Sequence, residues 1–181
     1  MADGEQIFPY SEDALRYGTY MGLFWIVKFS FIPLGFGVMP ILQLLFVLST
    51  LFVPVLGYLF VRKYRDIYNE GDFSFLKAFR FTALMYLAAI LLVAVAHFVY
   101  FKYMDHGYLV DCYQQQVQAM KEIYKGTDSA LIDKATQAAD MLEGLSPMQM
   151  VTQLLIQNVF YCVLLSALTA LCAMKRKHRK I

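Results

Sequence analysis

A long uncharged stretch limits the fold of this chain more than any other feature of its sequence. Residues 39–61 contain no Asp, Glu, Lys or Arg. An α-helix rises about 1.5 Å per residue, so about 20 apolar residues cross the hydrocarbon core of a bilayer. Stretches of similar length and polarity follow at residues 17–37, 81–101 and 148–174, and Lys28 is the one charged residue in all four. We therefore predict four membrane-spanning helices.

The composition supports the same class of protein. Hydrophobic residues make up 59% of the 181 residues and charged residues 17%, and the mean hydropathy is +0.49. Soluble domains usually contain about 45–50% apolar residues. The formal net charge is only +2, so we expect no nucleic-acid partner. Three cysteines without C-x-x-C spacing predict neither a disulfide framework nor a metal site, and we expect no cofactor.

The region between the third and fourth spans, residues 105–145, is polar enough to lie outside the membrane. Its apolar residues recur at helical spacing in two runs, with turn-forming residues 126–129 between them. The runs are Leu109, Tyr113, Val117, Met120 and Tyr124, then Leu131, Ala135, Ala138 and Leu142. We therefore predict an all-α fold in one domain, residues 1–181: an integral membrane four-helix bundle with an extracytoplasmic helical hairpin.

Two serines precede apolar stretches in a way that favours helix N-caps. Ser146, Pro147 and Gln149 have the order of a capping box, in which the serine and the glutamine bond each other's backbone N–H groups. Ser74 is a second candidate cap. Gly35, Gly37 and Pro40 favour a tight reversal between the first two spans.

The basic residues predict which way the helices cross. The connector, residues 62–80, holds five Lys or Arg; Arg16 and five residues of the tail bring the total on that side to eleven. The opposite side receives only four, namely Lys102, Lys121, Lys125 and Lys134. Because cytoplasmic loops are enriched in Lys and Arg, we expect both termini in the cytoplasm and residues 105–145 on the other side.

Lys28 is the strongest pointer to function, because a charge at mid-bilayer costs about 2.5–3.5 kcal/mol. Other polar residues have comparable depths in the four spans, and together they define a candidate polar cleft: Lys28, Gln43, His97, Gln153, Gln157 and Asn158. Such a cleft would receive an anionic group such as a lipid phosphate. The alternative is that the Gln and His residues bond neighbouring helices at about 0.6 kcal/mol each, and that Lys28 is hydrated or contacts another subunit.

A second candidate site lies at the cytoplasmic side. Six basic residues there are candidates for binding anionic headgroups: Arg62, Lys63, Arg65, Lys175, Arg176 and Lys177. Each such residue near a membrane surface contributes roughly 1 kcal/mol to binding an anionic lipid. The alternative is that they only determine topology.

Several enzyme motifs are missing from the sequence, including GxSxG, HExxH and a glycine-rich phosphate loop. We therefore expect a protein that is not an enzyme. Catalysis through His97 or His106 is the least favoured of the hypotheses.

Short motifs along the chain resemble one known family. They are Arg16-Tyr17-Gly18, Met21-Gly22, Tyr64-Arg65-Asp66, the Gly71 turn, Phe73-Ser74-Phe75, Lys77-Ala78-Phe79 and Tyr103-Met104-Asp105. In this order they resemble the bacterial membrane family of domain of unknown function 4199, over residues 15–174. The resemblance implies a four-helix protein of the inner membrane of Bacteroidota. The family has no established activity, so the resemblance assigns no catalytic residue.

The favoured hypothesis for function is a non-enzymatic accessory or scaffold subunit that contacts a protein partner or further copies of itself in the bilayer. The alternative is a carrier or flippase-like accessory for an anionic, polyprenyl-phosphate-linked lipid, acting with a membrane glycosyltransferase. Lys28, the polar residues near its depth and the basic cytoplasmic residues favour that alternative.

Overall fold

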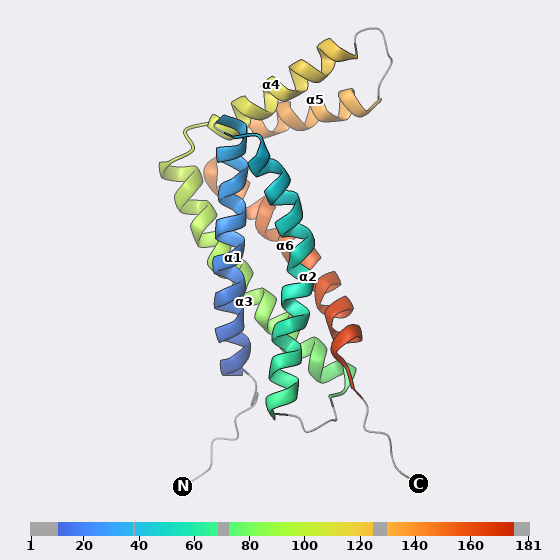
Figure 1. Ribbon diagram of the computed structural model, residues 1–181. Coiled ribbons are helices and arrows are strands. Elements are labelled where there is room, and N and C mark those ends of the chain that lie inside the picture. Colours follow the sequence, from blue (N-terminus) through green and yellow to red (C-terminus); the bar gives the residue numbers. More distant parts are fainter. Residues whose placement is uncertain (1–10, 38, 69–72, 125–129, 176–181) are drawn as a thin grey trace, which may run out of the picture.

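The computed structural model describes residues 11–37, 39–68, 73–124 and 130–175, which form six helices (Figure 1). Their bounds are α1 Ser11–Gly37, α2 Ile41–Tyr68, α3 Phe75–Tyr103, α4 Tyr108–Ile123, α5 Ala130–Glu143 and α6 Pro147–Ala173. The all-α prediction is therefore confirmed.

Four of the helices, α1, α2, α3 and α6, are long and apolar enough to cross a membrane. They pack as a bundle in which α3 lies against both α1 and α6, while α2 packs mainly on α1 and also touches α6. The predicted four-helix membrane bundle is thus confirmed. The helices are longer than the apolar stretches, because α2 continues to Tyr68 and α3 begins at Phe75, so both extend into the basic connector.

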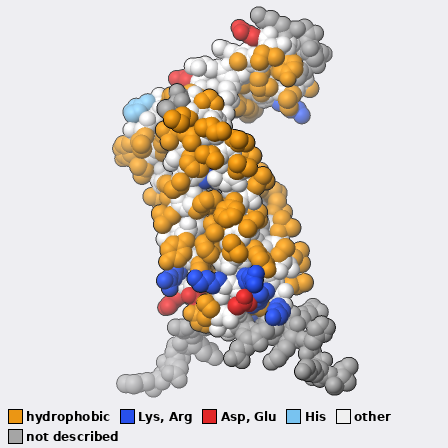
Figure 2. All heavy atoms as spheres, in the orientation of Figure 1, with side chains coloured by type: hydrophobic (Ala, Val, Ile, Leu, Met, Phe, Trp, Pro, Cys, Tyr) orange, Lys and Arg blue, Asp and Glu red, His pale blue; other side chains and the backbone are white. Residues whose placement is uncertain are grey.

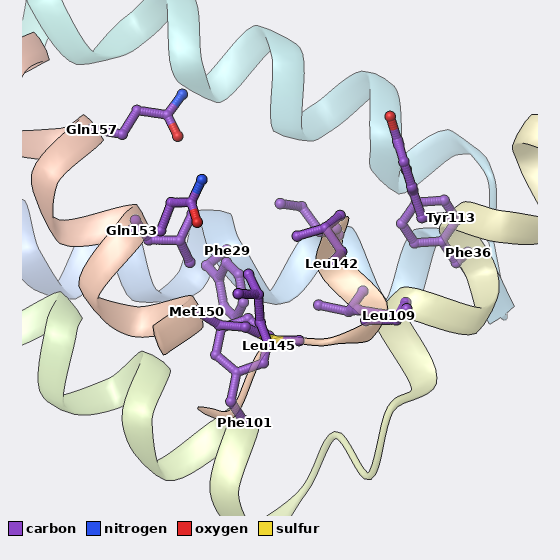
Figure 3. A pocket seen from close by; sticks show the side chains of 13 residues that line it. Phe29, Phe36, Phe101, Leu109, Tyr113, Leu142, Leu145, Met150, Gln153 and Gln157 are labelled. Carbon is purple, nitrogen blue, oxygen red and sulfur yellow. The ribbon is translucent and has the colours of Figure 1, made fainter. Parts of the chain in front are cut away.

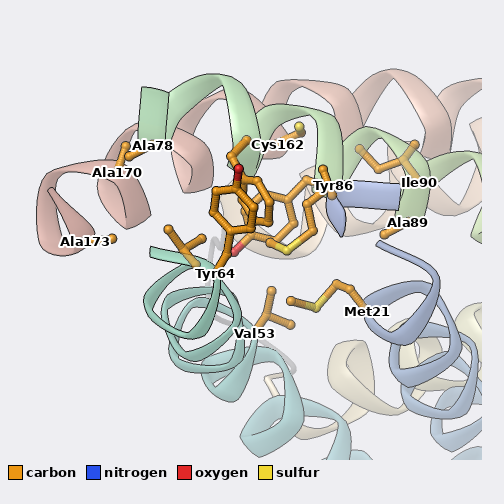
Figure 4. Close-up of a cluster of buried hydrophobic side chains, with 14 of the residues drawn as sticks. Met21, Val53, Tyr64, Ala78, Tyr86, Ala89, Ile90, Cys162, Ala170 and Ala173 are labelled. Carbon is orange, nitrogen blue, oxygen red and sulfur yellow. The ribbon is translucent and has the colours of Figure 1, made fainter. Parts of the chain in front are cut away.

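Small residues let the helices approach closely, as is common in membrane bundles. A Cβ atom placed on Gly18 of α1 would lie 2.6 Å from the carbonyl oxygen of Met85 in α3. A Cβ atom on Gly57 of α2 would overlap the Tyr86 hydroxyl of α3. Tyr86 is fully buried, and its ring stacks on Trp25 of α1 at 6.1 Å between centroids. Figure 4 shows Tyr86 among aliphatic side chains of several helices. Tyr86 therefore joins α3 to both α1 and α2.

The connector and the end of α6 are tied together at one end of the bundle. Phe73 and Lys175 exchange two backbone hydrogen bonds, of 2.8 and 2.9 Å. The Arg65 guanidinium donates from Nη1 to the carbonyl oxygen of Ala173, at 2.9 Å. This bond satisfies one of the carbonyls that a helix C-terminus leaves without a partner. The first residue of α1 and the last residue of α6 lie at this same end (Figure 1).

The chain turns sharply between α3 and α4. His106 has φ of 46° and Gly107 has φ of 88°, a left-handed conformation that glycine adopts without strain. The buried Asp105 carboxylate, two residues before the N-cap Gly107, accepts a hydrogen bond from the Leu109 N–H at 3.2 Å and so satisfies one free N–H in the first turn of α4. The Tyr108 hydroxyl donates to the Pro33 carbonyl at 3.3 Å, which ties α4 to α1.

Helices α4 and α5 pack against each other beyond the opposite end of the bundle (Figure 1). The Gln114 amide donates to the Glu143 carboxylate at 3.0 Å and links them. Each buries few side chains: Val117 in α4, and Ile132 and Ala139 in α5. The predicted turn at residues 126–129 lies outside the described residues. That these helices are extracytoplasmic stays a prediction.

The two predicted caps differ in the structure. Ser146 forms the full capping box: its hydroxyl accepts from the Gln149 N–H at 3.4 Å, and its own N–H donates to Gln149 Oε1 at 2.8 Å. Ser74 occupies the N-cap position of α3, but its side chain makes no capping hydrogen bond.

Candidate functional site

Lys28 lies on α1 with its ammonium group against two aromatic rings. Its Nζ atom is 5.6 Å from the centre of the Trp25 ring and 5.2 Å from that of Phe46 in α2. A cation over a ring face gains about 0.5–2 kcal/mol. Lys28 precedes the end of α1, Gly37, by nine residues, or about 13 Å along the helix axis. The ammonium group therefore lies well inside the apolar length of α1, between α1 and α2.

No carboxylate of this chain lies at the depth of Lys28 along the long apolar helices. In the sequence, no Asp or Glu occurs between Asp13 and Asp66, between Asp72 and Asp105, or after Glu143. The membrane-spanning parts of α1, α2, α3 and α6 therefore offer no counter-charge to Lys28. The aromatic rings reduce the cost of the buried cation, but they do not neutralise it.

His97 of α3 is buried, with 6% of its surface exposed, and its ring centre lies 4.2 Å from that of Phe29. Its Nε2 atom and the Nε1 atom of Trp25 are both buried without a hydrogen-bond partner among the described residues. A buried polar atom left unpaired costs about 1–3 kcal/mol. His97 is therefore held by ring contacts with α1 rather than by hydrogen bonds to polar side chains of the candidate cleft.

A cavity of about 350 Å³ lies where α1, α3 and α6 meet α4 and the end of α5. Two of its thirteen lining residues are the carboxamides Gln153 and Gln157 of α6, and the rest are apolar or aromatic: Phe29, Ile32, Phe36, Phe101, Leu109, Val110, Tyr113, Leu142, Leu145, Met150 and Leu154. Figure 3 shows Gln153 and Gln157 next to each other on α6 at the edge of the cavity. We call this space the apolar cavity.

The structure thus brings two of the six predicted cleft residues together. Gln153 and Gln157 line the apolar cavity, whereas Lys28, Gln43, His97 and Asn158 are not among its lining residues. Gln43 packs at the reversal between α1 and α2, where a Cβ atom on Gly35 would lie 2.8 Å from its Cγ atom. Asn158 is half-buried on α6.

The aromatic residues Phe29 and Phe101 were not predicted as lining residues. Their sequence pattern matches ordinary helix packing, and only the assembly of five helices makes them cavity walls. The aromatic cluster at residues 100–103 is the one sequence signal near this region, since it marks the level of the headgroups.

The predicted headgroup-binding residues have different environments. The Arg65 side chain is 13% exposed and is held by Ala173 and by Asp66, with Nη2 at 2.8 Å from the carboxylate. Arg62 is 56% exposed and pairs with Asp66 at 3.6 Å. Lys63 and Lys175 are exposed, while Arg176 and Lys177 lie outside the described residues. Figure 2 shows Lys and Arg side chains in a band at this end of the molecule, with hydrophobic side chains above it.

His106, the other histidine considered for catalysis, is an exposed turn residue. Its Nδ1 atom lies 3.2 Å from the Met104 carbonyl oxygen. The contact belongs to the turn between α3 and α4, because both residues lie within it.

A family model described as Protein of unknown function (DUF4199) matches residues 16–175. The match begins in the first turns of α1 and ends at Lys175, so it includes all four long apolar helices and the pair α4 and α5. No curated protein and no solved structure matches the chain. This integral membrane protein belongs to the family of proteins of unknown function DUF4199.

Proposed function

We propose that the protein is a non-enzymatic accessory subunit of a membrane complex, and that Lys28 binds a carboxylate on a membrane helix of its partner. The observation that carries this proposal is the position of Lys28, a cation in the hydrocarbon region without a carboxylate of its own chain at that depth. A partner carboxylate would offset the cost of that charge, and Lys28 would offset the cost of the carboxylate.

Both helices that Lys28 lies between expose apolar side chains that could meet another helix. Leu23 and Val27 on α1 and Leu45 and Leu48 on α2 are exposed apolar residues. These residues could face either lipid or the apolar face of a neighbouring helix. The charge of Lys28 is the feature that distinguishes the two possibilities. A lipid phosphate stays outside the hydrocarbon core, whereas a side chain on a partner helix occupies whatever depth its position sets. The depth of Lys28, about 13 Å from the helix end, therefore favours a protein carboxylate.

A second copy of this chain does not fit that role. The four spans contain no Asp or Glu, so a homo-oligomer would add further lysines at the same depth without adding a counter-charge. The proposed partner is a different protein. We further propose that both proteins lie in a bacterial inner membrane, with both termini of this chain in the cytoplasm.

The alternative function is a carrier for an anionic lipid, such as a polyprenyl phosphate, that acts with a membrane glycosyltransferase. The exposed basic residues Lys63, in the last turns of α2, and Lys175, just after α6, favour it, because an anionic headgroup would meet the bundle at its helix ends. The apolar cavity does not extend this argument, because its lining contains no Lys or Arg.

The test is extraction of the tagged protein from its own membrane in a mild detergent, in three forms. Lys28→Met removes the membrane charge, and Lys63→Met is the matched control that removes an exposed one. A partner with Asp or Glu in a membrane helix should co-purify with wild type and with Lys63→Met. With Lys28→Met its recovery should fall at least about tenfold, which corresponds to about 1.4 kcal/mol.

Exchange of the two charges makes the test specific. Lys28→Glu should abolish recovery, and replacement of the partner's carboxylate by Lys should restore it. Equal recovery of the partner with Lys28→Met would contradict the proposal. Loss of a bound polyprenyl phosphate from Lys28→Met, without any protein partner in wild type, would make the carrier function the better one.

A further inference from the structure

The end of the bundle next to α4 carries a second, charged hollow beside the apolar cavity. It has a volume of about 390 Å³, and Lys102, Asp105, His106, Asp111 and Glu143 are among its lining residues. We call it the charged hollow. It shares Phe101, Val110, Leu145 and Met150 with the apolar cavity. The two spaces therefore adjoin at these four residues, with a charged lining on one side and an almost wholly apolar lining on the other.

The shared wall lies at the level where the membrane helices end. Phe101 is in the last turn of α3, and Met150 is in the first turn of α6. From there the apolar cavity follows α6 to Gln157, ten residues or about 15 Å past Pro147. The charged hollow is built from the turn between α3 and α4 and from the end of α5. The apolar cavity thus reaches from hydrocarbon depth at Gln157 to the residues of α4 and α5 beyond the bundle end, and the charged hollow lies at headgroup depth.

The charged side chains of the hollow suit a headgroup that carries both signs. Among the described residues, Lys102, Asp111 and Glu143 form no ion pair. Lys102 is exposed, and its Nζ atom lies 5.3 and 5.2 Å from the ring centres of Phe98 and Tyr103. Its ammonium group can meet a phosphate, while the carboxylates of Asp111 and Glu143 can accept hydrogen bonds from an amine.

The balance of charge distinguishes between lipid classes. Three carboxylates and one lysine line the hollow, so a headgroup with net negative charge would be repelled. A primary ammonium donates up to three hydrogen bonds to carboxylates, whereas a quaternary ammonium has no N–H to donate. Asp105 is buried and already accepts from the Leu109 N–H. Asp111 and Glu143 are exposed, and the Glu143 carboxylate can accept further hydrogen bonds besides the one from Gln114, so these two remain for the amine.

We propose that this site binds one phospholipid with a phosphoethanolamine headgroup in the charged hollow and one acyl chain in the apolar cavity. The cavity volume lies within the range of about 300–1,000 Å³ that ligand pockets occupy. Gln153, six residues past the start of α6 and so about 9 Å deep, is placed to donate to an ester carbonyl. Lys28 does not line either space, so this proposal is independent of the proposed function.

Native mass spectrometry of the delipidated protein tests the proposal. The probe is an equimolar mixture of palmitoyl-oleoyl phosphatidylethanolamine, phosphatidylcholine and phosphatidylglycerol. We expect one bound phosphatidylethanolamine per chain, with a preference of at least about fivefold over the other two lipids, since 1 kcal/mol of differential affinity corresponds to that factor. Equal binding of the three lipids would overturn the proposal.

Two substitutions in α6 distinguish lipid binding in the apolar cavity from lipid binding on the outer surface of the protein. Leu154→Trp places a larger ring in the apolar cavity and should remove the bound lipid. Leu164→Trp is the matched control, because Leu164 is exposed on the same helix and lines neither space. Retention of the lipid by a folded Leu154→Trp variant would overturn the acyl-chain site.

Two changes that each remove one charge at the surface test the headgroup. Glu143→Gln keeps the hydrogen bond with Gln114 within reach, so the variant should fold, and the preference for phosphatidylethanolamine should fall at least about threefold because its amine loses an ionic partner. Lys102→Gln should weaken lipid binding, because the phosphate loses its contact with the Lys102 ammonium group. The opposite outcome is a preference for phosphatidylglycerol that falls in Lys102→Gln and rises in Glu143→Gln. That result would show an anionic-lipid site instead.

Discussion

The Tyr86 hydroxyl lies against the backbone of Gly57, so that a Cβ atom on the glycine would overlap it. The same hydroxyl is 3.4 Å from Thr169 Oγ1 of α6. One phenol therefore fills the space where α2, α3 and α6 meet, and a single methyl group is enough to disturb it.

We predict that Gly57→Ala lowers the free energy of unfolding by about 1–3 kcal/mol, the usual cost of overpacking. The measurement is unfolding in mixed micelles with rising sodium dodecyl sulfate, followed by circular dichroism. Gly144→Ala is the control, because a Cβ atom there meets nothing within 4 Å. Tyr86→Phe removes the overlapping oxygen, so the double variant should be more stable than the sum of the two single effects. Simple additivity would contradict the contact.

Arg65 should be a structural residue rather than a headgroup-binding one. Its guanidinium is held by the Ala173 carbonyl and by Asp66. Arg65→Ala should cost about 1–3 kcal/mol of stability, because a hydrogen bond from a charged donor is lost at the end of α6. Arg62→Ala, at an exposed ion pair with the same aspartate, should cost less than about 1 kcal/mol. Equal effects in the same micelle assay would argue against this distinction.

In the purified protein, without the proposed partner, Lys28 should not add to stability. Lys28→Met removes a charge whose burial costs about 2.5–3.5 kcal/mol and loses ring contacts worth about 0.5–2 kcal/mol. The purified variant should therefore unfold at the same or higher detergent fraction than wild type. A loss of more than about 1 kcal/mol would instead make Lys28 a structural residue of the α1–α2 contact.

The orientation of the chain can be tested at two exposed N-cap serines. Ser74 lies near the end that holds Lys175, and Ser146 lies near α4 and α5. In a background without native cysteines, Ser146→Cys should react with a membrane-impermeant maleimide in intact cells. Ser74→Cys should react only after permeabilisation, because its side of the membrane carries eleven basic residues and is predicted to be cytoplasmic. The reverse pattern would invert the topology.

The sequence predicted the membrane helices well, because the absence of charge over about 20 residues leaves few other folds. Local caps were less certain. Ser146 has Pro147 and Gln149 to complete its capping box, and the box forms. Ser74 is followed by Phe75, Leu76 and Lys77, which offer no reciprocal partner, and it caps by position alone.

The arrangement of polar residues was harder to predict. The spacing of Gln153 and Gln157 places them one turn apart on the same face, and they do line one cavity. The depth of Lys28 along α1 could also be predicted from the sequence. The direction in which its side chain points around the helix could not, because that depends on how α1 packs on α2. No pattern in the sequence of α1 or α2 predicts the contact of Lys28 with Phe46.

The backbone bridge between Phe73 and Lys175 has a mechanical consequence. It clamps the link between α2 and α3 to the end of α6, so at this end three of the four long helices share one anchor. In the part of the chain that the structure describes, no backbone bridge of this kind joins α3 to α6 at the far end; there α1 and α2 meet at their reversal, and α4 meets α1 through the bond from Tyr108 to Pro33. Any separation of the long helices should therefore be smallest at the bridged end and largest at the end where the apolar cavity lies.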